Sequence, residues 1–169
     1  PPFGGYGPSF TNPRTGQIIG ADIMLEFVYM TNRIRYDELL NPQKEQNNHD
    51  YCQFGSMMQH EMLLGKTSLE AANAPKEEIS RMLKEGLYHL VLHEVGHTLG
   101  LRHNFKGSSI YSINQLSDSN FTKKYGISGS VMDYQPINIF NKKTFFQTQP
   151  GVYDMWAIEY AYAEPNRSK

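Results

Sequence analysis

One short segment, residues 93–103, says more about the fold than any other part of the sequence. It reads His-Glu-Val-Gly-His-Thr-Leu-Gly-Leu-Arg-His. His93 and His97 are four residues apart, so on an α-helix they rise by about 6 Å and point to one side. Two imidazoles in that arrangement can bind a single metal ion, and zinc at about 2.0 to 2.1 Å from each nitrogen is the ion that fits them. The segment therefore predicts a helix that carries half of a metal site.

The rest of the segment predicts a third ligand. Two helical histidines leave a tetrahedral ion short of ligands, so another must approach from outside the helix. Gly100 can take the left-handed conformation that ends a helix, which allows His103 to return toward the ion. Three neutral histidines leave one position for water, as in a catalytic zinc site. We expect one catalytic Zn²⁺ bound by His93, His97 and His103.

Glu94 is the candidate catalytic group of the segment. It follows His93 by one residue, about 100° around the helix, so its carboxylate should miss the metal but reach the bound water. We expect it to act as general base and then to protonate the leaving amine. His89 cannot replace one of the ligands, because it lies about 12 Å from His97 along the helix axis. We expect His89 to be a packed residue, and His49 and His60 to be surface residues.

The surrounding sequence predicts the helix that contains the first part of this segment. Pro75 followed by acidic residues is typical of a helix start, which gives a helix over about 76–99. Two apolar stripes at helical spacing make this helix central. They are Tyr88, Leu92, Val95 and Leu99, and beside them Leu83, Leu87 and Leu90. Other expected elements are an extended arm over 1–10, a turn at 12–16, and helices over 56–72, 118–125 and 153–162. The apolar run over 17–28 is expected to be a strand at least to Leu25, with a helix as the alternative for its later half.

Composition excludes several classes of function. The formal net charge is −1 without a long basic run, which argues against nucleic acid as the main partner. No apolar stretch approaches about 18 residues, so no membrane span is expected. Cys52 is the single cysteine, so it cannot form an internal disulfide, and a lone cysteine is most often a small buried hydrophobic residue. The start at Pro1, without Met or a signal peptide, suggests a mature or excised piece of something longer.

Segment 93–103 matches the signature of the metzincin metallopeptidases, which pairs this zinc motif with a downstream methionine turn. Here the downstream candidate is Ser130-Val131-Met132-Asp133-Tyr134. The resemblance implies that Met132 forms an apolar floor beneath the metal without binding it. In astacin-like and serralysin-like members a tyrosine at the position of Tyr134 binds near the zinc, where it would donate a hydrogen bond to the developing oxyanion. The alternative is that Tyr134 is an ordinary core tyrosine.

A wider resemblance covers most of the chain. Residues 12–23, 93–105, 130–134 and 153–159 are similar to bacterial zinc-dependent metallopeptidases of the Met-zincin group, which are large multi-domain proteins. It implies an α+β catalytic domain in which a small mixed sheet with an edge strand covers the long zinc-binding helix. The upper part would span 1–100, and a lower part over 101–169 would hold the methionine turn and the C-terminal helix. The strand near 17–24 resembles the metzincin edge strand, which binds an extended peptide by β-augmentation, and a core strand is its alternative.

The function that follows is a zinc-dependent endopeptidase acting on an extended peptide or protein. The resemblance places it in a secreted, periplasmic or cell-surface setting, as part of a larger protein. Two alternatives stay open: a catalytically silent zinc-bearing domain that binds peptides or glycans, and a zinc hydrolase of small amides or esters. Asn104 follows the third histidine where astacins and matrixins place an acidic residue, so the sequence assigns neither subfamily. Cleavage specificity follows no sequence rule that we can apply.

Overall fold

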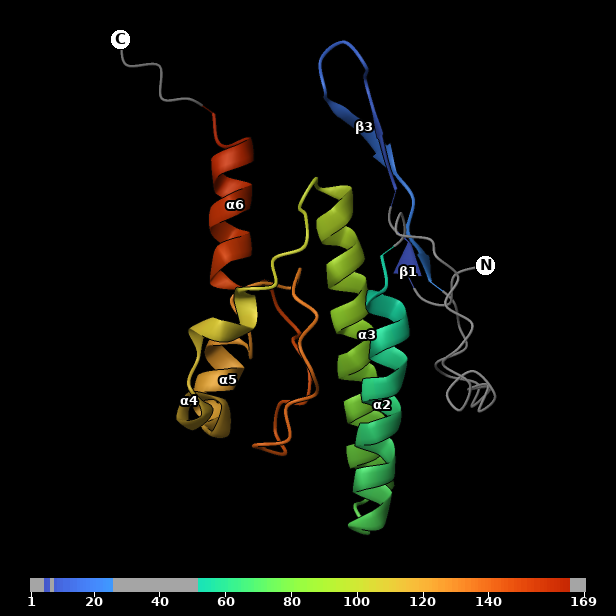
Figure 1. Cartoon of the computed structure of the whole chain (residues 1–169), viewed down its shortest axis with the longest axis vertical. Helices are drawn as coiled ribbons and strands as arrows, with labels where there is room; N and C mark the ends of the chain where they lie inside the picture. The colour runs from blue at the N-terminus through green and yellow to red at the C-terminus, as the bar shows by residue number, and fades with distance from the viewer. Residues whose placement is uncertain (1–4, 7, 26–51, 165–169) are drawn as a thin grey trace.

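Two long helices form the centre of the structure. The computed structural model describes residues 5–6, 8–25 and 52–164. Helix α2 spans Phe54–Ala71, and helix α3 spans Lys76–Thr98, one residue short of the expected end. The short turn between them reverses the chain, so the two helices run side by side in opposite directions (Figure 1). In this turn Asn73 has a φ of 52°, a left-handed conformation that asparagine tolerates better than most residues.

Methionines packed against glycines hold α2 and α3 together. A Cβ atom at Gly86 of α3 would lie 3.0 Å from Met62 Cε, and one at Gly65 of α2 would lie 3.2 Å from Met82 Sδ. The missing Cβ atoms therefore let the helices approach closely, and flexible methionine side chains fill the gaps. The buried core is formed by Phe54, Met58, Met62, Leu69, Met82, Leu90, Ile137, Phe145 and Phe146.

The first apolar stripe expected on α3 does not mark its buried face, because Tyr88 is 62% exposed and Leu99 is 42% exposed, so that part of the expectation is wrong. The second stripe is confirmed in part, because Leu90 is buried in the core and Leu83 packs partly buried against it. The residues that α3 buries are Met82, Gly86, His89, Leu90, His93, Glu94, Gly96 and Thr98. This face combines apolar Met82 and Leu90 with small and polar residues, and α2 packs against it. Hydrophobic periodicity therefore predicted only part of the buried side of the helix.

Among the described residues the strands form two separate antiparallel pairs and not one mixed sheet. β1 (Gly5–Tyr6) pairs with β4 (Met24–Leu25), and β2 (Ser9–Thr11) pairs with β3 (Ile18–Ala21). The first ten residues were expected to be an arm without a regular ladder, yet they supply two short strands. The β2–β3 hairpin projects beyond the helices in Figure 1, and the run expected over 17–25 is divided between β3 and β4.

The expected turn at residues 12–16 closes this hairpin. The backbone N–H of Gly16 donates to the carbonyl of Asn12 at 2.8 Å, and Asn12 N–H donates to Gln17 O at 2.8 Å. Gly16 has a φ of +73°, which a residue without a Cβ atom adopts readily. The turn therefore lies where the sequence placed it, and β2 and β3 extend from its two ends.

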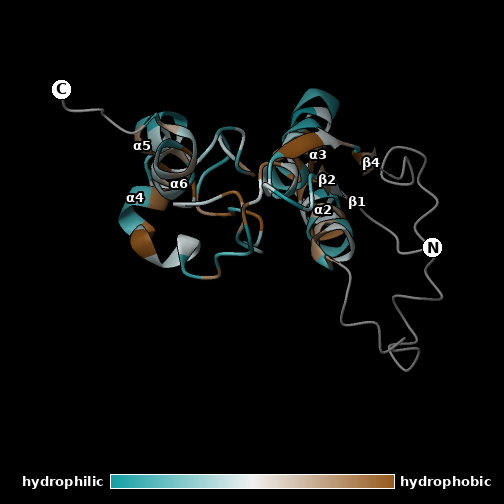
Figure 2. Ribbon diagram, turned by 90° about the horizontal axis from the view of Figure 1, so that it is seen from above, coloured by the Kyte–Doolittle hydropathy of each residue, from teal (hydrophilic) through white to brown (hydrophobic). Residues whose placement is uncertain are grey.

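The second half of the chain lies on the other side of α3. The 3₁₀ helix η2 spans Gly107–Ile110, followed by α4 (Ile113–Ser117), α5 (Ser119–Tyr125) and α6 (Val152–Tyr162). Figures 1 and 2 both show α4, α5 and α6 on one side and α2, α3 and the strands on the other. Helix α4 was not predicted from the sequence. It starts with a capping box, in which Ser112 and Gln115 each accept the other's backbone N–H.

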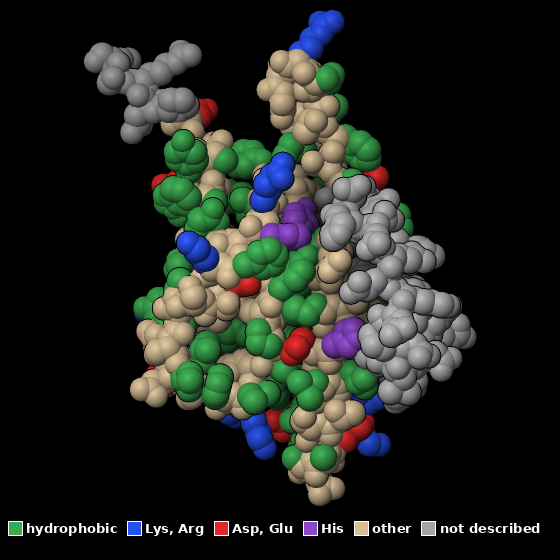
Figure 3. All heavy atoms as spheres, viewed as in Figure 1, with side chains coloured by type: hydrophobic (Ala, Val, Ile, Leu, Met, Phe, Trp, Pro, Cys, Tyr) green, Lys and Arg blue, Asp and Glu red, His purple; other side chains and the backbone are tan. Residues whose placement is uncertain are grey.

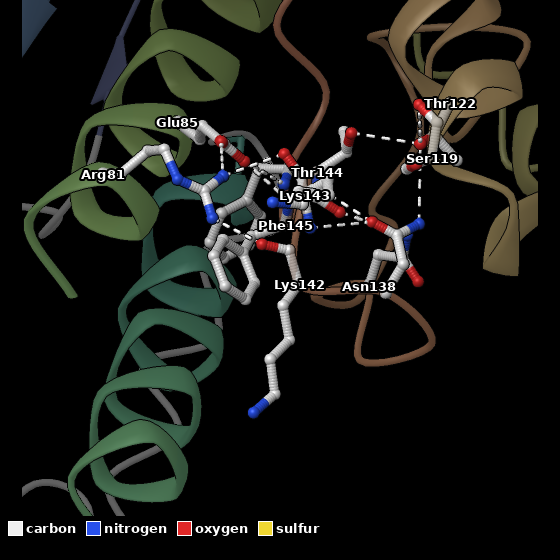
Figure 4. Close-up of polar contacts among 11 residues, drawn as sticks. Arg81, Glu85, Ser119, Thr122, Asn138, Lys142, Lys143, Thr144 and Phe145 are labelled. Carbon is white, nitrogen blue, oxygen red and sulfur yellow. Dashed lines mark hydrogen bonds and ion pairs between the residues drawn. The ribbon is translucent and has the colours of Figure 1, made fainter. Parts of the chain in front are cut away.

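An ion pair on α3 anchors the chain between α5 and α6 (Figure 4). The Arg81 guanidinium lies 2.7 Å from the Glu85 carboxylate and donates to the carbonyl of Lys143 at 2.8 Å. Glu85 in turn accepts the backbone N–H groups of Phe145 at 2.6 Å and Phe146 at 3.2 Å. Both phenylalanine side chains are buried in the core. The loop is thus held against α3 by charge-assisted hydrogen bonds and by apolar packing together.

Helix α6 exposes an aromatic surface. Trp156 and Tyr160 are stacked with ring centroids 5.7 Å apart, and Tyr160 is 80% exposed. Hydrophobic side chains gather around this helix in Figure 3. The search for a membrane-spanning helix among the described residues found none that is long and apolar enough.

Candidate metal centre

Four potential metal ligands converge where α3 ends. The donor atoms of Cys52, His93, His97 and His103 all lie within 4.8 Å of one another. The Nε2 atoms of His97 and His103 are 3.1 Å apart, and Cys52 Sγ is 3.4 Å from Nε2 of both His93 and His103. The three predicted histidines therefore come together, and a cysteine that was not predicted joins them. Histidine atoms reach the molecular surface in Figure 3.

Gly100 makes this convergence possible. It has a φ of +87°, the expected left-handed conformation. Gly100 N–H donates to His97 O at 2.9 Å and Leu101 N–H donates to Gly96 O at 2.9 Å, which is the Schellman pattern that ends a helix. The chain turns sharply within two residues, so the side chain of His103 returns to the last turn of α3.

The other ring nitrogens of the helical histidines are fixed by backbone carbonyls. Nδ1 of His93 is 2.7 Å from Val131 O, and Nδ1 of His97 is 3.0 Å from Leu101 O. A carbonyl oxygen can only accept, so each Nδ1 donates and each Nε2 carries the lone pair. This is the tautomer that a metal ligand needs, held by the kind of outer hydrogen bond that orients ligating histidines.

The electrostatics of the cluster favour a cation. Burial lowers the pKa of His93 to about 2, and it also lowers the pKa values of His97 and His103. At neutral pH the three imidazoles are therefore uncharged, and lone pairs of His93 and His97 face the centre. Because the imidazoles are neutral, few N–H or S–H protons lie between these lone pairs to reduce their mutual repulsion. A divalent ion would satisfy all of them, and imidazole nitrogen with cysteine sulfur is a donor set that zinc binds.

Glu94 is buried beside the cluster without a partner. Its side chain is 0% exposed, and neither carboxylate oxygen has a hydrogen-bond partner among the described residues. Burial raises the pKa of Glu94 to about 7. Its charge also contributes to raising the pKa of Cys52, although burial is the main cause of that shift. An unpartnered carboxylate is costly to bury, and a nearby cation would both stabilise it and lower its pKa.

Met132 lies against the turn of α3 that separates the two helical ligands. It is 0% exposed, and its sulfur atom occupies the position that a Cβ atom on Gly96 would need. The carbonyl of Met132 accepts the N–H of Asn104 at 2.9 Å, which ties the methionine turn to the residue after the third histidine. Asn104 also accepts the Lys106 N–H through its side chain at 3.3 Å. In this chain Asn104 therefore shapes the turn after His103.

Asp154 of α6 holds the methionine turn in place, and the sequence did not reveal this role. Its carboxylate accepts the Ser130 hydroxyl at 2.6 Å and the Val131 N–H at 2.8 Å. It also accepts the Gly151 N–H at 2.7 Å, which caps its own helix. Because Val131 O accepts from His93, one residue links Asp154 to a candidate ligand. The aspartate lies within the segment 153–159 that carried the family resemblance, but spacing alone gave it no function.

Tyr134 reaches the cluster with its hydroxyl group. Its oxygen lies 3.2 Å from His103 Nε2 and 3.2 Å from Cys52 Sγ, and it accepts the Gln53 N–H at 3.0 Å. The side chain is only half-buried, and burial raises its pKa above the usual value of tyrosine. The hydroxyl group therefore stays protonated at neutral pH and is available as a donor.

Cys52 and Phe54 are the site residues that sequence reasoning missed. The interpretation of Cys52 as a buried hydrophobic residue did not foresee that its sulfur lies among the ligands. The Phe54 ring stacks on His93 with centroids 4.1 Å apart and contacts His89 edge-on at 4.9 Å. Both residues lie at the start of α2, far from His93 in sequence. A usable signal was that Cys52 is the only thiol available to complete a metal site.

The remaining histidines lie outside the cluster. His89 is fully buried, and burial lowers its pKa to about 3. It packs against aromatic rings, as expected of a packed residue. His60 is exposed on α2, with its Nδ1 2.8 Å from Ser56 O. The prediction for His49 lies outside the described residues.

Comparison with known proteins agrees with the geometry. A family model described as Met-zincin matches residues 75–169, which include α3, the methionine turn and α6. No curated protein and no solved structure matches the chain. The match covers more than half of the 169 residues and contains all three predicted histidine ligands. This chain therefore belongs to the Met-zincin family.

Proposed function

We propose that this domain is a zinc-dependent endopeptidase in which His93, His97 and His103 bind one catalytic ion. The observation that carries the proposal is the convergence of three imidazole Nε2 atoms beside Glu94, a buried carboxylate with no partner among the described residues. Metal ligands alone would suit a structural site. A desolvated carboxylate held beside the candidate ligands, with no partner of its own, is what a general base for a metal-bound water requires.

The residues of the site divide the chemistry among them. When bound, zinc polarises the scissile carbonyl and makes the attacking water more acidic. Glu94 accepts the proton of that water and returns it to the leaving amine. Tyr134, which stays protonated, donates a hydrogen bond to the oxyanion of the tetrahedral intermediate. Met132 packs against the ligand helix at Gly96, and Asp154 holds the methionine turn whose Val131 carbonyl orients His93.

The β2–β3 hairpin supports a peptide as the substrate. A Cβ atom on Gly100 would lie 4.0 Å from Ile18 Cδ1, so the hairpin lies close to the end of the motif helix. Along β3 only one edge is paired within the described residues, and Ile19 is 70% exposed. An extended peptide could add to the other edge as a further strand, with the scissile bond between the upper part, 1–100, and the lower part, 101–169. A secreted, periplasmic or cell-surface setting in a larger protein remains part of this proposal.

A single substitution tests the mechanism. Glu94→Gln should keep one zinc ion per chain and lose at least about two orders of magnitude in casein hydrolysis, because the general base is removed and the ligands are not. Hydrolysis is measured with and without a chelator, in the wild-type chain and in a Cys52→Ala background, since Cys52 lies among the ligands. Glu77→Gln, at an exposed position on the same helix, is the matched control and should behave like wild type. Unchanged turnover in Glu94→Gln would remove Glu94 from the mechanism.

The same assays separate the alternatives. A zinc-bearing domain that only binds peptides or glycans would keep the metal and release no fragments in either background. A hydrolase of small amides or esters would cleave such substrates in a panel and leave peptides intact. Chelator-sensitive cleavage of peptides is the result that distinguishes the proposed endopeptidase from both.

A further inference from the structure

The sulfur of Cys52 occupies a place that a catalytic zinc site normally leaves to water. Building on the proposed function, we infer that Cys52 is the fourth zinc ligand and that the conformation described here is a latent, closed form of the peptidase. Activity then requires Cys52 to leave the ion.

The distances around Cys52 suit a shared ion. Tetrahedral zinc with Zn–N of about 2.0 to 2.1 Å and Zn–S of about 2.3 Å separates its donor atoms by roughly 3.3 to 3.6 Å. Cys52 Sγ is 3.4 Å from Nε2 of both His93 and His103, and the Nε2 atoms of His97 and His103 are 3.1 Å apart. Three of the six distances between donor atoms are therefore close to those of a tetrahedral shell, and all four donor atoms lie within 4.8 Å of one another.

Hydrogen bonding alone explains this arrangement less well. A thiol has one proton, yet Cys52 Sγ lies within 3.4 Å of three polar atoms, on His93, His103 and Tyr134. Nε2 of His93 carries a lone pair, because its Nδ1 donates to Val131 O. A thiolate bound to a metal needs no proton for any of these neighbours. Coordination therefore accounts for the whole set of contacts.

The surroundings of Cys52 point to latency and not to a permanently structural zinc. A structural site gains nothing from a fully buried carboxylate without a partner, yet Glu94 is placed in that way beside the cluster. Tyr134 likewise directs its hydroxyl group to the same point. Cys52 also lies just before the first residue of α2, so its withdrawal does not require the helix pair to come apart. The catalytic groups are assembled, and the thiol covers them.

X-ray absorption at the zinc edge tests the ligand directly. The zinc-loaded wild-type chain should show three nitrogen scatterers and one sulfur at about 2.3 Å. Cys52→Ala and Cys52→Ser should both lose the sulfur scatterer, keep the zinc and raise peptidase activity by roughly tenfold or more. If most wild-type molecules are in the closed state, only the small open fraction is active, and removing the thiol makes the other molecules active as well. Serine keeps a hydroxyl that can replace a thiol hydrogen bond to Tyr134. If Cys52 acted only through that bond, Cys52→Ser would behave like wild type and the inference would fail.

Alkylation provides a second readout that does not depend on a variant. Cys52 is the only cysteine, so iodoacetamide reports on it alone. It should react slowly in the zinc-loaded chain and rapidly after chelation, whereas Ser56→Ala, at an exposed position one turn into α2, should behave like wild type in every assay. Bound zinc without a sulfur scatterer overturns this inference and leaves the proposed function intact. Failure to bind zinc at all overturns both, and a sulfur shell with no gain of activity in either Cys52 variant overturns latency.

Discussion

His89 has no described hydrogen-bond partner although it lies one turn before a metal ligand. Both of its ring nitrogens are buried and unpartnered among the described residues, and Phe54 and Phe146 pack around it. Burial of a neutral imidazole is tolerable, but its protonated form would be desolvated without a counter-charge. This explains why its pKa lies near 3, well below the usual 6.5.

This burial predicts a specific acid sensitivity. Between about pH 3 and 6.5 the unfolded chain binds a proton at His89 that the folded chain does not, so the free energy of unfolding rises with pH across that window. Acidification from about pH 7.5 to 5 should therefore cost the wild type about 2 kcal/mol more than His89→Leu. Urea unfolding at matched metal loading measures this difference. His60→Gln, at an exposed position, should follow wild type, and equal pH dependence of His89→Leu and wild type would exclude the effect.

At the scale of single residues, the sequence predicted what local spacing determines. His93, His97, Glu94 and the bend at Gly100 lie within eight residues of one another, so helix geometry places them without knowledge of the rest of the fold. Cys52 could not be placed in the same way. Its approach to His93 depends on how α2 packs along α3. This tertiary contact joins residues 41 positions apart in the sequence, and neither hydrophobic periodicity nor motif spacing predicts it.

At the scale of the elements, α6 supports the candidate metal centre through the methionine turn, without contributing a candidate ligand. Asp154, near its start, accepts from Ser130, Val131 and Gly151, and Val131 positions His93. The N-terminal end of the helix, where its dipole favours a negative charge, carries this carboxylate. The methionine turn is therefore held by α6 at one side and by the ligand helix at the other.

Removing this carboxylate should damage both stability and metal binding. Asp154→Ala leaves three buried donors without their acceptor, so we expect a loss of about 3 kcal/mol or more in unfolding free energy. Because the turn orients His93, zinc affinity should fall by about 10- to 100-fold. Denaturant titration and competition with a zinc indicator measure the two effects. Glu159→Gln, exposed on the same helix, is the control, and unchanged zinc affinity in a folded Asp154→Ala protein would break the proposed link.

The elements differ in how well the sequence predicted them. Helices α3, α5 and α6 lie within one residue of their expected ends, because proline, glycine and acidic residues mark their boundaries. The strands were predicted less well, since pairing partners depend on chain contacts that residue preference does not specify. The stripe through Tyr88 also misled, because the buried face of α3 combines Met82 and Leu90 with glycines and candidate ligands and does not follow apolar side chains alone.

Across the whole molecule, a bound ion would join parts that are distant in sequence. Its candidate ligands come from the start of α2, from α3 and from the chain after Gly100. The described structure links the two sides by other means as well, such as the Glu85 contacts to residues 145–146 and the hydrogen bond from the Tyr162 hydroxyl to Leu99 O at 2.9 Å. Metal binding should thus contribute to global stability without being its only source.

Chelation should lower the melting temperature. At free zinc about 100 times its dissociation constant, binding stabilises the fold by about 2.7 kcal/mol, which corresponds to a shift of roughly 5 to 10 °C for a chain of this size. Calorimetry with and without a chelator measures the shift. Glu94→Gln should keep it, because that residue is no ligand, whereas His103→Ala should lose most of it. An identical melting curve after verified zinc removal would show that the ion does not couple the two sides.

The contact between Met132 and Gly96 has a consequence for oxidative damage. The sulfur atom lies against the helix turn between His93 and His97, and the Met132 side chain is fully buried. Because solvent does not reach the side chain, we expect peroxide to modify this methionine only after the turn has moved away from the helix. Loss of the metal site and oxidation of Met132 would then be a single event, while the exposed Met24 and Met155 are modified in the intact fold.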